Sequence, residues 1–129
     1  MNIFDHVSLG VTSIDDARRF YDPAMEVLGL SCLATNNVFA AYGKDSIQFL
    51  LMVPVDGAAY TQGNGTHVAF RADSQAAVDS FHAIAVQAGG VCEGEPGPRP
   101  DYPVTDVYAA FVRDPFGHEL EVIHNGFAA

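Results

Sequence analysis

A weak internal repeat limits the folds open to this chain more than any other feature of its sequence. Residues 5–30 align with residues 66–91 without a gap, so that His6 falls on His67. Each copy starts with alternating apolar and polar residues, continues as a helical pattern and reaches glycine where that pattern ends. The 129 residues are enough for one domain. We therefore expect a single domain built from two similar modules.

The modules are expected to cover about 1–60 and 64–129, and each has the pattern of a strand, a helix and three more strands. Alternation over 3–11 and 66–72 predicts the opening strands. The further strands are expected at 30–35, 37–42, 47–53, 90–94, 107–113 and 118–124. This βαβββ order in each half predicts an α+β fold.

Caps and prolines mark the limits of the helices and loops. The candidate helix N-caps are Thr12 or Ser13 in the first module, and Asp73 or Ser74 in the second. Pro23 removes a backbone donor inside the first helical pattern, and we expect it to kink or split that helix. Segment 94–106 holds four of the seven prolines and is expected to be a stiff loop that covers a cavity.

Hairpin pairing predicts which side chains share a face, because cross-strand partners point the same way. In the second hairpin we expect Phe111 opposite Leu120 and Ala110 opposite Glu121. Phe111 and Leu120 would then face the helix, while Tyr108 and Glu121 would face the other way.

The first hairpin leads to a similar division of its side chains. We expect Tyr42 opposite Ile47 and Ala41 opposite Gln48. The residues expected on the face away from the helix are Phe39, Ala41, Gln48, Leu50 and Met52.

Four polar side chains, related in pairs by the repeat, are expected on the face away from the helices. His6 corresponds to His67, and the hairpins pair Gln48 with Glu121. Two neutral imidazoles and a carboxylate, with an amide nearby, suit a divalent metal that keeps open positions. Each residue taken alone is equally well explained as an ordinary hydrogen-bonded or exposed side chain. We give that ordinary interpretation to His82, His118 and His124.

Charge and cysteine content restrict the partners and the compartment. Six basic residues against 16 acidic ones leave a net charge of −10, which would repel nucleic acid and anionic lipid surfaces. No apolar run is long enough for a membrane helix, and from the first residues of the sequence we expect no secretory signal. Cys32 and Cys92 are expected to be reduced, buried and structural, in a cytoplasmic protein.

Three segments resemble the vicinal oxygen chelate superfamily, which includes lactoylglutathione lyases, bleomycin resistance proteins and extradiol dioxygenases. These segments are FDHVSLGVTSIDDARRFYDPAMEVLGL, GTHVAFRADS and YAAFVRDPFGHELEVI. The resemblance implies a U-shaped, eight-stranded mixed sheet around a cavity, with the helices on its outer face. It also implies a small-molecule substrate and a homodimer. Apolar residues that favour such a dimer are Ile3, Phe4, Tyr21, Met25 and Leu30.

The resemblance further implies a metal site and a reaction. The implied ligands are His6, Gln48, His67 and Glu121, and three-ligand members lack the one at Gln48. The ion (Zn, Ni, Co, Mn or Fe) would chelate two substrate oxygens and stabilise an enediolate, with Glu121 as general base. The residues expected to contact substrate are Arg71, Tyr108, Phe39, Leu50 and Met52. The implied activity is a lyase or isomerase similar to lactoylglutathione lyase; the alternatives are a non-catalytic binding protein and an Fe(II) dioxygenase.

Overall fold

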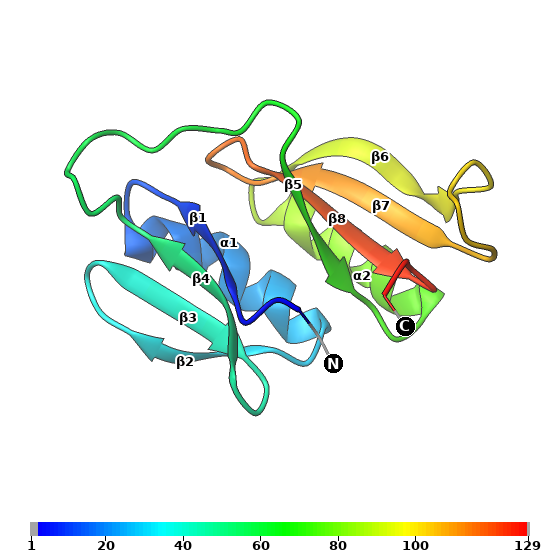
Figure 1. The fold of residues 1–129 in the computed structure, drawn as a ribbon, viewed down its shortest axis with the longest axis horizontal. Coiled ribbons are helices and arrows are strands. Elements are labelled where there is room, and N and C mark those ends of the chain that lie inside the picture. Colours follow the sequence, from blue (N-terminus) through cyan, green and yellow to red (C-terminus); the bar gives the residue numbers. More distant parts are fainter. Residues whose placement is uncertain (1–2, 129) are drawn as a thin grey trace.

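The computed structural model describes residues 3–128, in which each half of the chain forms a four-stranded sheet with one helix (Figure 1). The first module contains β1 (Val7–Gly10), α1 (Ile14–Val27), β2 (Ser31–Thr35), β3 (Phe39–Gly43) and β4 (Ile47–Met52). The second contains β5 (His67–Arg71), α2 (Gln75–Gln87), β6 (Val91–Pro98), β7 (Tyr108–Arg113) and β8 (Glu119–His124). Residues 1–2 and 129, at the ends of the expected modules, lie outside the described residues. The expected α+β class and βαβββ order are confirmed.

The two sheets have the same strand order and carry both helices on one side. The orders are β1-β4-β3-β2 and β5-β8-β7-β6, and the first and last strands of each module pair in parallel. In Figure 1, β1 and β5 are the facing edges, they run in opposite directions, and α1 and α2 lie behind the sheets. We call the side of the sheets turned away from the helices the inner face. The eight expected strands are thus present as two mixed sheets.

Serine side chains cap both helices. Ser13 Oγ accepts a hydrogen bond from the backbone N–H of Asp16, and Ser74 Oγ accepts one from Ala77. Pro23 lies inside α1, yet the helix continues from Ile14 to Val27, so of the two expected effects, a kink or a split, the split does not occur. Packing compensates for the missing hydrogen bond, because the apolar stripe of α1 is fully buried. Within residues 3–128, neither helix is long and apolar enough to cross a bilayer.

An apolar core continues from one module into the other between the helices and the sheets. The ring of Phe49 from β4 meets that of Phe70 from β5 edge to face, with centroids 5.1 Å apart. Phe70 in turn lies 6.1 Å from Phe81 of α2. Tyr21 and Met25, which the sequence offered as dimer surface, are fully buried in this core, so that part of the expectation is wrong.

The turn between β7 and β8 links the second module to the first. The Tyr21 hydroxyl of α1 donates a hydrogen bond to the buried carboxylate of Asp114. His118 Nε2 lies 2.6 Å from the carbonyl oxygen of Gly10. The Tyr60 hydroxyl, from the segment between the modules, donates to the Phe116 carbonyl at 2.9 Å. The ordinary, hydrogen-bonded role expected for His118 is therefore confirmed.

The first hairpin pairs two positions away from the expected register, and its faces are nevertheless as expected. Tyr42 lies opposite Phe49, and Ala41 opposite Leu50, with an irregularity beside Gly43. Side chains alternate with a period of two, so a shift of two residues leaves every side chain on its original face. Phe39, Leu50 and Met52 thus lie on the inner face, as expected.

The second hairpin pairs one position away from the expected register, and this reverses the faces of β7. Phe111 lies opposite Glu121, and Val112 opposite Leu120. Phe111 is therefore on the inner face, and Tyr108 is on the helix side, the reverse of the expectation. The physical reason is that a shift by one residue moves a whole strand's side chains to the other face.

Strand β6 extends further into the proline-rich segment than expected. It runs from Val91 to Pro98 and forms the edge of its sheet. Prolines are tolerated there because an edge strand leaves half of its backbone groups without ladder partners. The pairing with β7 shifts register between Cys92 and Gly94, and again between Gly94 and Gly97. The strand is therefore present but irregular.

Candidate functional site

A histidine and a buried carboxylate meet on the inner face of the second module. His67 is the first residue of β5, and Glu121 lies on the neighbouring parallel strand β8, opposite Ala69. His67 Nε2 lies 3.2 Å from Glu121 Oε1. The Glu121 residue is only 4% exposed, while the His67 side chain is 45% exposed. The structure thus brings together two of the residues expected to form the site.

A tyrosine that sequence reasoning missed completes the environment of the carboxylate. Tyr102, in the loop between β6 and β7, donates a hydrogen bond from its hydroxyl to Glu121 Oε2 at 2.9 Å. Its ring packs against Phe127, with centroids 5.4 Å apart. Burial, followed by the hydrogen bond to Glu121, raises the pKa of Tyr102 to about 12. The sequence feature that could have indicated Tyr102 is the presence of an aromatic residue within the proline-rich segment.

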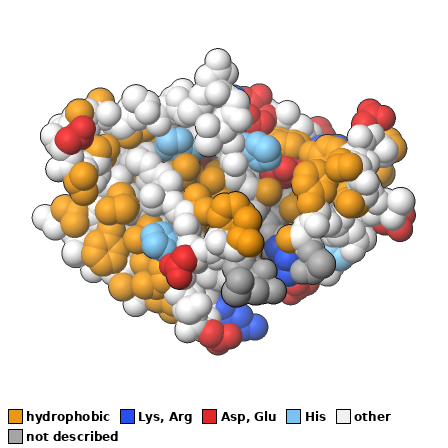
Figure 2. Space-filling model, in the orientation of Figure 1, with side chains coloured by type: hydrophobic (Ala, Val, Ile, Leu, Met, Phe, Trp, Pro, Cys, Tyr) orange, Lys and Arg blue, Asp and Glu red, His pale blue; other side chains and the backbone are white. Residues whose placement is uncertain are grey.

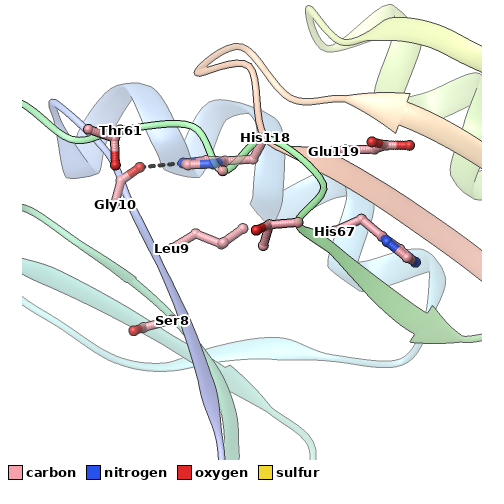
Figure 3. A pocket seen from close by; sticks show the side chains of 9 residues that line it. Ser8, Leu9, Gly10, Thr61, His67, His118 and Glu119 are labelled. Atoms are coloured by element: carbon pink, nitrogen blue, oxygen red, sulfur yellow. Dashed lines mark hydrogen bonds between the residues drawn. The ribbon is translucent and has the colours of Figure 1, made fainter.

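A pocket of about 260 Å³ lies between the modules, beside this pair (Figure 3). Its lining comes from β1, the connecting segment, β5 and the start of β8: Ser8, Leu9, Gly10, Thr61, Gly63, Thr66, His67, His118 and Glu119. Figure 3 shows His118 hydrogen-bonded to Gly10 at the top of the pocket, and the His67 imidazole turned away from Ser8. His67 thus lines the pocket and also contacts Glu121.

The other expected histidine lies apart from the pair. His6 precedes β1, its side chain is 52% exposed, and its Nδ1 contacts the Asp5 carboxylate. Because β1 and β5 run in opposite directions, their starting residues lie at opposite ends of the facing edges (Figure 1). Among residues 3–128, His6 does not form a group with His67 and Glu121 in which all ligand atoms lie within 4.8 Å of one another.

The strand registers change the expected correspondence between the modules. Phe49 pairs with Val7 in the first module, as Leu120 pairs with Val68 in the second. Gln48 therefore corresponds to Glu119, and Leu50 is the counterpart of Glu121. The expected pairing of Gln48 with Glu121 by the repeat is wrong, because both hairpins pair in registers that differ from the expected ones. The first module thus has an apolar side chain where the second has its buried carboxylate.

The cationic and aromatic residues expected to contact substrate are divided between the two faces. Arg71 shares the inner face with Ile123, is exposed, and contacts the Ala128 carbonyl at 3.5 Å. Tyr108 instead donates a hydrogen bond to Asp79 of α2 at 2.6 Å, so its expected place on the inner face is wrong. The guanidinium of Arg99 lies 5.9 Å from the ring centroid of Phe111, which the sequence placed on the helix side.

Comparison with known proteins agrees with this architecture. The family profile described as "Glyoxalase/Bleomycin resistance protein/Dioxygenase superfamily" matches residues 3–122. The chain therefore belongs to this superfamily, and the resemblance found in the sequence is confirmed.

Individual relatives cover nearly the whole chain. A Vibrio cholerae protein described as "Probable lactoylglutathione lyase" is 31% identical over an alignment of 132 positions, which covers 93% of this chain and 88% of that protein. A glyoxalase/bleomycin resistance protein from Albidiferax ferrireducens is 32% identical, with a TM-score of 0.87, over 97% of this chain and all of that one. A glyoxalase-related enzyme from Fulvimarina pelagi, at 19% identity and a TM-score of 0.77 over both full chains, shares the fold.

Proposed function

We propose that this protein is a divalent-metal-dependent enzyme that acts on a small oxygenated substrate by lyase or isomerase chemistry. The observation that carries the proposal is the Glu121 carboxylate, which is buried on the inner face and held between His67 Nε2 and the Tyr102 hydroxyl. Buried carboxylates are costly unless they are paired, so their placement commonly serves a site. The relative described as a lyase supports this choice of chemistry.

The donor atoms at this place suit a borderline divalent ion. An imidazole nitrogen and a carboxylate oxygen already lie 3.2 Å apart in His67 and Glu121, and His6 is the proposed third ligand. A metal held there supplies a Lewis acid for a substrate oxygen. Gln48 is not required, because its place in the sheet corresponds to Glu119 rather than to Glu121.

Side chains of the protein would then transfer the proton and orient the substrate. Glu121 Oε2 accepts the substrate proton once the Tyr102 hydroxyl turns away from it, and returns the proton to a neighbouring carbon or oxygen. Tyr102, donating to the same oxygen, holds the carboxylate in place between turnovers. Arg71 and Arg99 provide positive charge at the inner face for an anionic substrate. The apolar side chains of Phe39, Leu50 and Met52 exclude water on the first module's side.

We propose that a second copy of the chain supplies His6. Its imidazole is exposed and lies at the opposite end of the facing edges from His67. Ile3 and Phe4, three and two positions before it, are 83% and 67% exposed. Figure 2 shows further apolar side chains spread across the inner face of both modules. A twofold homodimer would bury them and bring His6 of one chain toward the pair in the other.

Metal titration tests the proposal. Zn²⁺, Ni²⁺, Co²⁺, Mn²⁺ and Fe²⁺ are titrated separately by calorimetry into the Cys92→Ser protein, because the Cys92 thiol lies close to His82 and Glu95 and could itself bind an ion. At least one ion should bind, and the loaded protein should form S-lactoylglutathione or turn over another small oxygenated substrate. If none of the five ions binds, the proposal of a metal-dependent function is wrong.

A metal-free binding protein is the competing function, and one observation favours it. Both oxygens of Glu121 already have protein partners, so the carboxylate is satisfied without an ion. In that case, small apolar ligands would raise the melting temperature of the wild type and of His67→Ala equally. Metal-dependent ligand binding that is lost in His67→Ala would instead support the enzyme.

A further inference from the structure

A second group of ligand-type side chains lies on the helix side of the second module, on the opposite side of the sheet from Glu121. It consists of His82 from α2 with Cys92 and Glu95 from β6. His82 Nε2 lies 3.1 Å from Cys92 Sγ, and Cys92 Sγ lies 3.5 Å from Glu95 Oε1. His82 is buried, Cys92 is half-buried and Glu95 is exposed, so the group is open to solvent on one side. The sequence had suggested an ordinary structural role for both His82 and Cys92.

A β-bulge brings the two strand residues to the same face. In a regular strand, residues three positions apart point to opposite faces. Here Cys92 pairs with Val112 and Gly94 pairs with Phe111, which leaves Glu93 as an additional residue. The bulge reverses the alternation after Cys92. Glu95 therefore points to the helix side together with Cys92, toward His82.

We propose that His82, Cys92 and Glu95 form a Zn²⁺ site, with water as the fourth ligand. Zinc accepts imidazole, thiolate and carboxylate donors, whereas Mg²⁺ and Ca²⁺ require oxygen ligands. In a tetrahedral zinc site, a sulfur at about 2.3 Å and a nitrogen or oxygen at about 2.0–2.1 Å are about 3.5 Å apart. The two separations in this group, 3.1 and 3.5 Å, are close to that spacing. The net charge of −10 also favours a cation.

The first module shows that the fold alone does not create this group. Strand β2 has the same irregularity, between Cys32 and Ala34, so Cys32 is the counterpart of Cys92. The residue equivalent to Glu95 is Thr35, whose hydroxyl donates to the Phe39 carbonyl at 3.0 Å. The helix position equivalent to His82 holds Tyr21, which is fully buried in the core. The second module alone thus has three ligand-type residues at these positions.

Cobalt substitution provides a test that is specific for sulfur ligation. A thiolate bound to Co²⁺ gives a charge-transfer absorption, and the inner-face residues His67, Glu121 and His6 contain no sulfur. Reduced protein carrying Glu121→Gln is titrated with Co²⁺ and then competed with Zn²⁺. One equivalent of Co²⁺ should produce the band, and Zn²⁺ should remove it.

Matched variants then assign the sulfur and its neighbours. Cys92→Ser should abolish the band, whereas Cys32→Ser should leave it unchanged. Glu95→Gln changes an exposed residue, so this variant should fold normally. Loss of a residue that only hydrogen-bonds to a metal ligand typically weakens metal binding about 10–100-fold. Loss of the proposed ligand Glu95 should weaken Co²⁺ binding at least as much. His82→Gln should weaken binding similarly, with folding checked by circular dichroism.

Three results would each overturn the zinc site. One is the absence of a thiolate–cobalt band in protein with both thiols reduced. Another is a band that persists in Cys92→Ser, and the third is an unchanged affinity for Co²⁺ in Glu95→Gln. Because the inner-face carboxylate is already removed in every sample, the outcome is independent of the proposed enzymatic function.

Discussion

The Tyr21 hydroxyl of the first module donates a hydrogen bond to the Asp114 carboxylate of the second, deep within the protein. Asp114 is 3% exposed, and its other oxygen accepts hydrogen bonds from the backbone N–H groups of Phe116 at 2.9 Å and His118 at 2.8 Å. Burial, together with the neighbouring Asp114 charge, raises the pKa of Tyr21 well above its ordinary value. The contact fixes α1 of one module to the hairpin turn of the other.

Removing this hydroxyl should lower the free energy of unfolding. Tyr21→Phe leaves a buried carboxylate oxygen without its donor, which typically costs about 1–3 kcal/mol. Urea unfolding followed by circular dichroism measures the loss. The matched control is Tyr108→Phe, which removes a tyrosine hydroxyl bonded to Asp79 at an exposed position. A loss in Tyr21→Phe no larger than in the control would contradict the role assigned to the contact.

His67→Ala should abolish stable metal binding at the inner face while leaving the fold intact. The residues that anchor β5 in the core are Val68 and Phe70, which point away from this face. Calorimetric titration in the Cys92→Ser background measures the affinity. Glu119→Gln is the control, because Glu119 lies directly opposite His67 but does not hydrogen-bond to it. Equal affinity in His67→Ala and the control would refute the ligand assignment.

Gln48→Ala should leave the affinity of the inner-face site for metal unchanged. Gln48 is exposed, and the sheet registers make it the counterpart of Glu119, not of Glu121. The same titration decides the point. A clear loss of affinity would return Gln48 to the ligand set.

The Tyr102 hydroxyl should titrate late, with a pKa of about 12 against an ordinary value of 10.0. The neutral hydroxyl stabilises the fold fully below about pH 10, and this contribution is lost as pH rises through about 12. Glu121→Gln should lower the Tyr102 pKa without restoring 10.0, because burial is the largest cause of the shift. Carbon-13 tyrosine NMR follows each ring separately. The Tyr108 pKa should not change, since the hydrogen bond to Asp79 is the main reason why that pKa is raised.

Mixing two inactive variants tests whether the site is shared between chains. If His6 joins the His67–Glu121 pair of a second copy, His6→Ala and Glu121→Gln proteins should each lack metal-dependent activity. Exchanging their subunits should restore one intact site in each mixed dimer. Light scattering should report about twice the 13.8 kDa chain mass. Activity that stays absent after verified subunit exchange would place each site within a single chain.

The sequence by itself determined the repeat, the order of elements and the faces of the strands whose alternation is unbroken. Periodicity is a local property, so β1, α1, β4, β5 and α2 were predictable from residue spacing, and so was the inner-face position of His67 and Glu121. The faces predicted for the first hairpin were correct although its predicted register was wrong by two residues, because side chains alternate between faces with a period of two.

Tertiary structure alone decided the features that depend on register and on contacts distant in the chain. A one-residue difference in the second hairpin placed Tyr108 on α2 and Phe111 on the inner face. The bulge in β6 turned Glu95 toward Cys92, and no spacing rule predicts where a bulge forms. Tyr102 reached Glu121 only because its loop folds back over the sheet. Strand direction separated His6 from His67, because side chains related by the repeat lie at opposite ends when the facing strands are antiparallel.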